Sequence, residues 1–508
     1  MLAQFLCCLV LPFSVLILSG TSSAAQFIVT TTADGVSPVP PGSLRAAILA
    51  ANANVGADVI TFDPAIFPPL PAVPGAIAPL TSLPNLTGPG DTIDGTGAGV
   101  VIDGLNFDPA DQIAGLRVRA SDVTIQGLTF QNFSGNDAVI VEGRNATPVV
   151  TDVTISGNSF FNNRRGVRID GGTQTANTNV SASVLDNILQ ENIRGILVRG
   201  NAPGSDGGNA VSAVIDGNVV QGKSVPEGDA GSGINLQGGS DVGSFNNVIS
   251  VVTNNTVTQV RNDGIVANGC TANATGSHNT VNATIVGNTV KYLRNPPPSA
   301  LRNNGIIVTG AAGETLETSF CSFNSVSFVV AENNVDGFKT INITVGGGDE
   351  GTNNNTVSGS IVANHVSGSA GRGIQVSGGT GNNHSVDVLI SANMSNRNAI
   401  EGIRVVAGSG IGNIVSLDGV INNTASRNGG DGIAIGSNIP GIGGGTPVSG
   451  NRTDWNGEDG IDINSPGYIL SNNRASRNTG AGIDAVGNVN GGGNVATGNA
   501  TCNTPGCF

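Results

Sequence analysis

Five acidic side chains recur at equivalent places in short repeats near the C-terminus. Three of them, Glu401, Asp431 and Asp459, each precede a glycine that opens an apolar alternation. The other two, Asp462 and Asp484, lie two residues after such a glycine. If the repeats stack as strands, we expect these carboxylates to gather on one outward face, about 4.8 Å apart from repeat to repeat.

Clustered carboxylates support two kinds of chemistry. A pair can act as general acid and base on a glycosidic bond, so Glu401, Asp431 and Asp459 are candidate catalytic residues. A cluster can also hold calcium that bridges to an anionic sugar, so Asp459, Asp462 and Asp484 are candidate metal ligands and calcium is the candidate cofactor. Turn formation is the competing interpretation, because Asp-Gly steps shape turns. It accounts for Asp431 and Asp459 more easily than for Asp462 and Asp484.

Basic and aromatic side chains supply candidate ligand-binding groups. Arginine forks hold carboxylates or sulfates, and the set comprises Arg165, Arg168, Arg194, Arg199 and Arg404. The first four lie on outward positions of two consecutive repeats, where Asp170 and Glu191 could instead neutralise them. Trp455 is the only tryptophan. It is suited to stack on a sugar ring, although a lone surface tryptophan also serves as a packing plug.

The histidines show no catalytic motif. His278, His365 and His384 lie neither in a His-Glu-x-x-His helix nor near a Gly-x-Ser-x-Gly elbow. An imidazole without an orienting partner supports little acid–base chemistry. We therefore expect all three to be solvated loop residues.

The composition favours a repetitive β-protein. Of 508 residues, 11% are charged, 4% are aromatic and 76 are glycines. The low charge argues against disorder, and the glycines lack the every-third spacing of collagen. With 36 acidic and 22 basic residues the net charge is −14, which argues against nucleic acid or an anionic membrane as a partner.

Asparagine recurs with a regular spacing. Asn158 and Asn187 are 29 residues apart, as are Asn364 and Asn393. Each asparagine ends an apolar strand, and we expect it to occupy a turn with left-handed backbone conformation. The full series is Asn158, Asn187, Asn218, Asn255, Asn288, Asn334, Asn364, Asn393, Asn423, Asn451 and Asn473.

Each repeat contains two or three strands and no helical periodicity. Short strands that recur once per repeat can satisfy their backbone only by pairing with the next repeat, which winds the chain into a parallel β-solenoid. Val167 and Ile169, like Ile461 and Ile463, are then inward members of aliphatic ladders.

The N-terminal segment predicts export. Residues 1–25 carry no charge, contain an apolar run and end in small residues, which indicates a secretory signal peptide. We therefore expect a secreted, periplasmic or cell-surface protein with no integral membrane span after cleavage. In an exported chain the remaining cysteines can form two disulfides, and we pair Cys270 with Cys321 and Cys502 with Cys507. Free thiols are the alternative.

The repeats, with their Asn turns and Gly-Ile/Val-x-Val/Ile strands, resemble right-handed parallel β-helix proteins of the pectin-lyase-like superfamily. Further likeness lies in Phe27 to Asp34, Pro41 to Ile48 and Gly56 to Phe62, which resemble exported β-helix proteins with a Ser-Leu-Arg-Glu-Ala-type motif. Ala46 stands where that motif often has Glu. The resemblance implies the right-handed winding, and polysaccharide lyases, hydrolases or epimerases as activities, but their characteristic Gly-His-Gly and Asn-Thr-Asp segments are missing.

The sequence thus predicts an all-β chain with one right-handed parallel β-helix. We expect a signal peptide over 1–25, a cap and irregular first coil over 26–91, the β-helix over 92–495 and a C-terminal end over 496–508. Ser43 is a good N-cap for a capping helix from Leu44 to about Ala53. Two functions remain open: a noncatalytic scaffold that binds polysaccharides, cell-surface glycans or other surface partners, and an enzyme that uses the C-terminal carboxylates.

Overall fold

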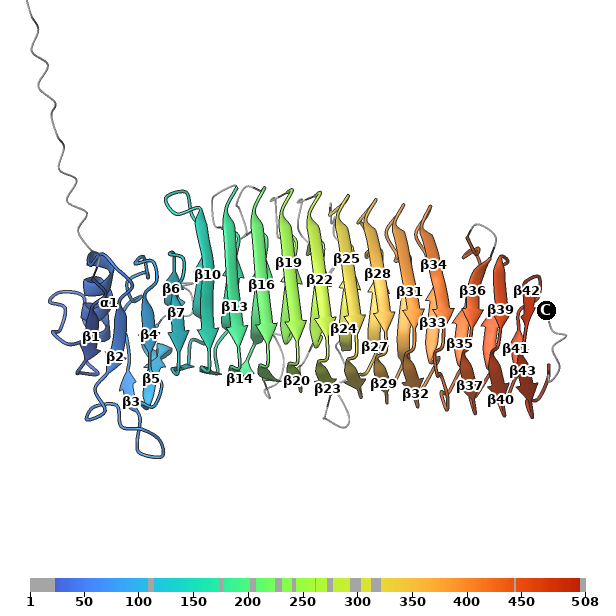
Figure 1. The fold of residues 1–508 in the computed structure, drawn as a ribbon, viewed down its shortest axis with the longest axis horizontal. Helices are drawn as coiled ribbons and strands as arrows, with labels where there is room; N and C mark the ends of the chain where they lie inside the picture. The colour runs from blue at the N-terminus through green and yellow to red at the C-terminus, as the bar shows by residue number, and fades with distance from the viewer. Residues whose placement is uncertain are drawn as a thin grey trace, which may run out of the picture.

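The computed structural model describes residues 23–107, 114–172, 177–201, 207–223, 231–239, 244–260, 262–271, 277–292, 303–311, 321–442 and 445–502. Within them the chain forms a right-handed parallel β-helix, a long stack of coils with the first coil at one end and the last at the other (Figure 1). This confirms the predicted fold class. The predicted signal peptide lies, up to residue 22, outside the described residues.

Each typical coil contributes one strand to each of three sheets, and the strand pairs are parallel. In the described part of the chain, sheet A has sixteen strands. They are β1 (Gln26–Val29), β2 (Val59–Phe62), β4 (Thr92–Asp94), β7 (Thr124–Gln126), β10 (Val149–Ser156), β13 (Asn179–Leu185), β16 (Ala210–Asp216), β19 (Asn247–Thr253), β22 (Thr280–Val286), β25 (Ser325–Ala331), β28 (Thr356–Val362), β31 (Ser385–Ser391), β34 (Ile414–Ile421), β36 (Thr446–Ser449), β39 (Tyr468–Ser471) and β42 (Val489–Gly492).

Sheet B follows sheet A within each coil. Its strands are β3 (Gly75–Ile77), β5 (Val100–Asp103), β8 (Thr129–Gln131), β11 (Ser159–Phe161), β14 (Ile188–Asn192), β17 (Val219–Gly222), β20 (Thr256–Thr258), β23 (Thr289–Lys291), β26 (Asn334–Asp336), β29 (His365–Ser367) and β32 (Met394–Asn396). Bridges at Thr424 continue it into β37 (Arg452–Asp454), β40 (Arg474–Ser476) and β43 (Val495–Thr497).

Sheet C closes each coil and carries the residues of interest. Its strands are β6 (Ala114–Val118), β9 (Asp137–Glu142), β12 (Arg165–Asp170), β15 (Arg194–Arg199), β18 (Ile234–Gln237), β21 (Ile265–Asn268), β24 (Asn304–Thr309), β27 (Ile341–Gly346), β30 (Arg372–Ser377), β33 (Ile403–Val406), β35 (Ile433–Ile435), β38 (Ile461–Ile463) and β41 (Ile483–Asp484).

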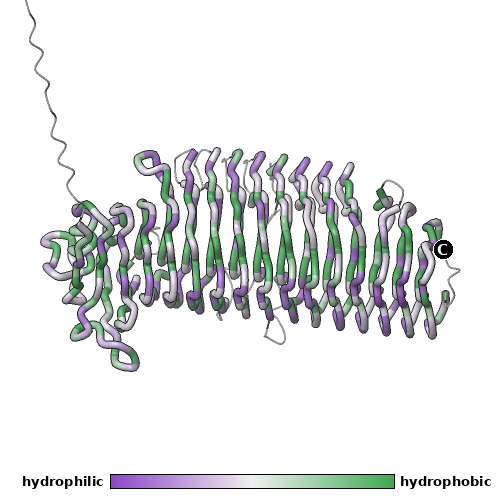
Figure 2. The backbone as a smooth tube through the Cα atoms, in the orientation of Figure 1, coloured by the Kyte–Doolittle hydropathy of each residue, from purple (hydrophilic) through white to green (hydrophobic). Residues whose placement is uncertain are grey.

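The core is a thin column of stacked aliphatic side chains. Val167, Ile169 and Ile461 are fully buried and Ile463 is 2% exposed, as the alternation predicts. Hydrophobic and hydrophilic residues alternate along the strands in Figure 2, because successive side chains of a strand point to opposite faces.

Asparagine ladders join the coils at their corners. The Asn158 backbone N–H and side-chain amide both donate to Asn187 Oδ1, at 2.9 and 3.1 Å. Buried amides in a continuous ladder keep their polar atoms hydrogen-bonded. Two details of the prediction were wrong. First, Asn288 hydrogen-bonds to Asn333 in the next coil rather than to Asn334. Second, the residue with left-handed backbone is the one before each ladder asparagine, such as Gly157 with φ 60°.

The N-terminal end contains the predicted helix. α1 (Leu44–Ala53) begins after Ser43, whose hydroxyl accepts a hydrogen bond from the Ala46 N–H at 3.1 Å. Its buried face, which includes Leu44 and Ile48, belongs to the same core cluster as β1 and β2. A short 3-10 helix, η1 (Gly104–Asn106), follows β5. Sheet A starts with β1 and β2, which lie within the segment 26–91.

A disulfide joins two loops between neighbouring coils. Cys270 and Cys321 are bonded and buried, with their Cα atoms 6.2 Å apart, which confirms that predicted pair. Cys507, the predicted partner of Cys502, lies outside the described residues.

Candidate functional site

The register of sheet C brings the predicted outward residues into one column. Gln375 pairs with Arg404, Arg404 with Ala434, Ala434 with Asp462, and Asp462 with Asp484. Backbone hydrogen bonds stack the residues that precede each glycine in the same way, since the Gly402 N–H donates to the Asp431 carbonyl and the Gly432 N–H donates to the Asp459 carbonyl. The two columns lie side by side on the outer face of sheet C.

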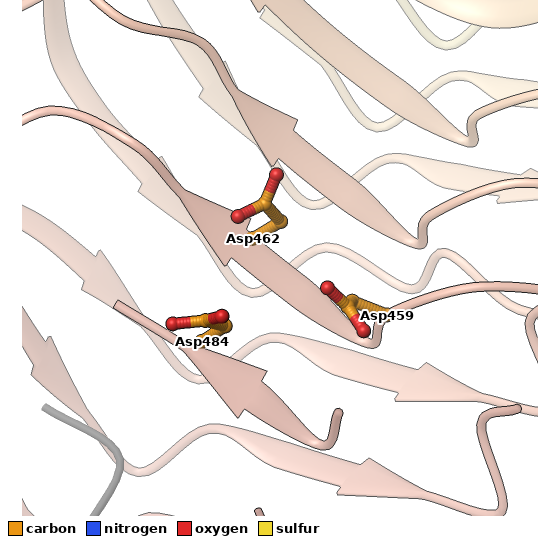
Figure 3. A group of neighbouring side chains, drawn as sticks. All are labelled: Asp459, Asp462 and Asp484. Carbon is orange, nitrogen blue, oxygen red and sulfur yellow. The ribbon is translucent and has the colours of Figure 1, made fainter. Parts of the chain in front are cut away.

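Three carboxylates converge on the last coils. Asp459 lies two residues before β38, Asp462 within it and Asp484 on the neighbouring β41 (Figure 3). One carboxylate oxygen from each lies within 4.8 Å of the other two, and all three side chains are half-buried. Burial, together with the charges of Asp459 and Asp484, raises the pKa of Asp462. The set can offer hard oxygen ligands to a divalent cation.

The hydrogen bonds of these groups involve one oxygen at a time. The Ala481 N–H donates to Asp459 Oδ1, and the Asn464 amide donates to Asp462 Oδ2 at 2.7 Å. No ion pair engages Asp459, Asp462 or Asp484 within the described ranges. The carboxylate groups therefore retain acceptor capacity for a ligand.

Asp431 lies one coil before Asp459 and has a raised pKa. Its Oδ1 accepts the Asp459 N–H at 2.8 Å. Burial raises the pKa of Asp431 to about 7, and repulsion from Asp462 and Asp459 adds to the effect. A carboxyl group that exchanges a proton near neutral pH is suited to general acid or base chemistry.

Glu401 is engaged by two arginines. It is 5% exposed, its Oε2 accepts from Arg372 Nε at 2.7 Å, and its Oε1 pairs with Arg404. These contacts neutralise the carboxylate and hold Arg404 at the edge of the acidic column. The geometry thus separates Glu401 from the three carboxylates that converge two coils further on.

The predicted arginine group on the first coils is part of a buried ion-pair network. Arg165 and Arg168 contact Asp137 at 2.6 and 3.0 Å, and Arg199 contacts Asp170 at 2.7 Å. Burial opposes the charge on Asp137, but Arg168 and Arg165 hold the pKa of its carboxyl below the usual value. The neutralising role predicted for Asp170 is therefore present. Arg194 pairs in register with Arg165 on the adjacent strand.

Sequence reasoning missed a neighbouring ion-pair group centred on Glu142. Glu142 is fully buried, and its Oε1 accepts from Arg117 at 2.7 Å, Arg119 at 2.5 Å and Arg144 at 3.1 Å. Its Oε2 is buried and has no hydrogen-bond partner within the part of the chain that the structure describes. Strand register could have identified Glu142 as a candidate, because it is the partner of Asp170 on the adjacent strand of sheet C.

Two predicted surface residues have different environments. Trp455 is 53% exposed, and the guanidinium carbon of Arg477 lies 4.9 Å from its ring centroid. His384 is 1% exposed rather than solvated. Its Nδ1 accepts the Asn355 N–H at 3.1 Å, and its backbone N–H donates to Asn413 Oδ1, so it replaces an asparagine in a corner ladder.

Comparison with known proteins extends only to fold. No family model and no curated protein matches the sequence. Among solved structures, the Dettilon tailspike protein gp208 shares 14% identity over 84% of this chain and 66% of its own length, with TM-score 0.41. PfbA, a surface adhesin of Streptococcus pneumoniae, shares 12% identity over 78% of this chain and 93% of its own, with TM-score 0.39.

A third similar structure is an enzyme module. The A-module of the Azotobacter vinelandii mannuronan C-5 epimerase AlgE4 shares 15% identity over 86% of this chain and 93% of its own, with TM-score 0.33. Matches at this identity concern the fold, not the reaction. Separately, none of the helices in the described residues is long and apolar enough to cross a membrane.

Proposed function

We propose that this protein is an exported β-helix scaffold that binds an acidic glycan on the C-terminal coils of sheet C. In this proposal Asp459, Asp462 and Asp484 hold a calcium ion that bridges to carboxylates of the sugar chain. The supporting observation is the convergence of three half-buried carboxylates within 4.8 Å on two adjacent coils. Their mutual repulsion favours uptake of a cation.

The coordination chemistry leaves room for the glycan. Calcium takes about six to eight oxygen ligands, and three aspartates supply only part of that number. Water and sugar carboxylates would complete the shell. Asp431 and Glu401 then act beside the ion: Asp431 fixes the Asp459 backbone through its 2.8 Å hydrogen bond, and Glu401 positions Arg404.

Calcium titration tests this proposal. We expect calcium to raise the melting temperature and to promote binding of polygalacturonate, a soluble acidic polysaccharide, while a chelator reverses both effects. Asp462→Asn should abolish the calcium effect. Asp418→Asn is the matched control, because Asp418 is exposed on sheet A and loses the same charge. If wild type and both variants respond alike to calcium, the ion does not bind at this cluster.

A second function is favoured by the protonation of Asp431. Its pKa of about 7 suits a general acid or base in a polysaccharide lyase, hydrolase or epimerase with Asp459 as the partner carboxylate. An assay for reducing ends, unsaturated products and sugar epimers on acidic polysaccharides would reveal turnover. Asp431→Asn should abolish it while leaving calcium-dependent binding intact. If wild-type protein binds the glycan without any turnover, the scaffold function stands alone.

A further inference from the structure

Three exposed arginines and the single tryptophan form a row along one corner of the C-terminal coils. Arg397, Arg427, Trp455 and Arg477, here called the arginine row, each lie between the sheet B and sheet C segments of their coil. All four side chains are exposed. This corner is separate from the carboxylate column, which lies on the outer face of sheet C.

Backbone contacts place the members of the row directly above one another. The Arg397 N–H donates to the Ser426 carbonyl, the Arg427 N–H to the Asp454 carbonyl and the Trp455 N–H to the Ser476 carbonyl. The asparagine that follows each member belongs to a buried ladder, in which the Asn398 amide donates to Asn428 Oδ1 at 3.0 Å and the Asn428 amide to Asn456 Oδ1 at 3.1 Å. The row therefore repeats once per coil, about 4.8 Å apart.

The arginines of the row are not neutralised. Within the described part of the chain, Arg397, Arg427 and Arg477 form no ion pair. Arg474 on β40 adds a further exposed guanidinium beside them, with no ion pair in the described residues. It lies next to Arg452, which pairs with Asp454. A chain with net charge −14 thus concentrates uncompensated positive charge on one corner.

Local structure does not call for these residue types. Every member of the row has a left-handed backbone, with φ between 57° and 62°. Glycine and asparagine adopt this conformation at lower cost. Four other coils use them at the same position, Asn132, Asn162, Gly337 and Gly368, whereas Glu191 and Gln259 occupy it with φ 55° and 54° in two more. Arginine and tryptophan here go against the backbone preference, so a binding role explains them better than folding does.

We propose that the arginine row binds an acidic polysaccharide lengthwise along the corner. Guanidinium groups hold sugar carboxylates or sulfates, and the exposed ring of Trp455, with Arg477 4.9 Å from its centroid, offers an apolar face to a sugar ring. The inference takes the class of ligand, an acidic glycan, from the proposed function, but it concerns a different site. It requires no calcium, because the protein itself supplies the positive charge.

Trp455 makes the test specific, because the only tryptophan in the chain lies in the row. We expect its fluorescence to change saturably when polygalacturonate is added in the presence of a chelator, and sodium chloride to reverse the change by screening. Neutral dextran should have no effect. A fluorescence response that requires calcium, or no response despite binding, would overturn the proposal.

Two double variants that lose the same charge distinguish binding by the arginine row from a general effect of net charge. Arg397→Asn with Arg427→Asn should weaken polygalacturonate binding in chelator by about tenfold or more, since two charge-assisted contacts are lost. Asparagine occupies this position in the first coils, at Asn132 and Asn162, so the melting temperature should not fall. Arg164→Asn with Lys291→Asn removes the same charge from other coils and should leave affinity within about twofold.

Three outcomes would contradict this assignment. An equal loss of polygalacturonate affinity in the two double variants would show that only the net charge of the protein matters. Tighter binding of oligothymidylate than of polygalacturonate would make the row a nucleic acid site, and tighter binding of phosphatidylserine vesicles would make it a membrane contact. Asp462→Asn serves as the cross-check: it should remove only the calcium-dependent binding, so that failure of either site is visible by itself.

Discussion

The two ends of sheet C carry charge in different ways. On the first coils, Asp137, Glu142 and Asp170 are buried and each contacts at least one arginine. On the last coils, Asp459 and Asp462 are half-buried and stand beside other carboxylates without an ion pair in the described residues. The difference is not positional, because Arg168 and Asp462 occupy the same outward column of the sheet.

Burial accounts for the contrast. A charge removed from water must be compensated by an opposite charge or hydrogen bonds, or it neutralises. Glu142 is compensated by three arginines, whereas Asp431 has no such partner and its pKa moves to about 7. The buried carboxylates at the N-terminal end are therefore compensated by arginines, whereas Asp431, Asp459 and Asp462 at the C-terminal end form no ion pair in the described residues.

Removing the central carboxylate of the first network should give the largest effect. Glu142→Gln leaves Arg117, Arg119 and Arg144 near one another without their shared anion, so we expect a loss of about 3–5 kcal/mol in the free energy of unfolding. Urea denaturation measures it. Glu350→Gln, at an exposed turn, should change stability by less than about 0.5 kcal/mol. Similar values for the two variants would show that the network is dispensable.

His384 is a buried titratable group that has no charged partner among the described residues. Burial lowers its pKa to about 4, so the unfolded chain, with a pKa near 6.5, takes up the proton first as the pH falls. Stability from neutral His384 is therefore complete above about pH 6.5 and is lost progressively toward pH 4. His384→Asn introduces the residue type of the neighbouring ladder positions. It should reduce the stability that is lost on acidification by about 1 kcal/mol.

Melting curves at pH 7.5 and 4.5 test this prediction. His365→Asn is the control, because His365 is exposed at the start of β29. The two variants should differ only at the lower pH. An equal acid response in wild type and His384→Asn would place the acid sensitivity elsewhere.

The coil architecture could be predicted because it follows from periodicity. The column from Gln375 to Asp484 and the buried Val167 and Ile169 require only that equivalent residues of successive repeats stack. The Cys270–Cys321 bond follows from the same reasoning, since both cysteines lie in neighbouring repeats and the sequence predicts export.

Interactions between coils could not be predicted from spacing alone. The partner of Arg165 is Asp137, which lies one coil earlier and outside the repeats where neutralising groups were sought. His384 was expected in solvent because it has no catalytic motif, but its position in the asparagine ladder decides its burial. The choice between Asn333 and Asn334 depends on a one-residue register that adjacent asparagines leave open.

A smaller effect is expected at Asp431. Because its folded pKa of about 7 lies above the unfolded value, its contribution to stability is complete below about pH 4 and is lost as the pH rises through 7. Asp431→Asn keeps an oxygen for the Asp459 N–H but removes the charge. It should raise the stability at pH 8 by about 1 kcal/mol after solvent screening and change little at pH 4. A variant that is less stable at pH 8 would contradict this sign.

The smallest effect concerns the pair formed by Asp462 and Asp484, which are register neighbours on β38 and β41. Removing one of two like charges on adjacent strands should stabilise the protein by a few tenths of a kcal/mol, roughly 0.2–0.5 kcal/mol. Asp484→Asn should therefore melt slightly above wild type in chelator at low salt, and the gain should vanish at high salt through screening. Calcium should reverse the order, because the variant loses a ligand that wild type retains. The sign change with calcium separates an ion site from simple repulsion, since repulsion alone predicts the same order of stability in both conditions.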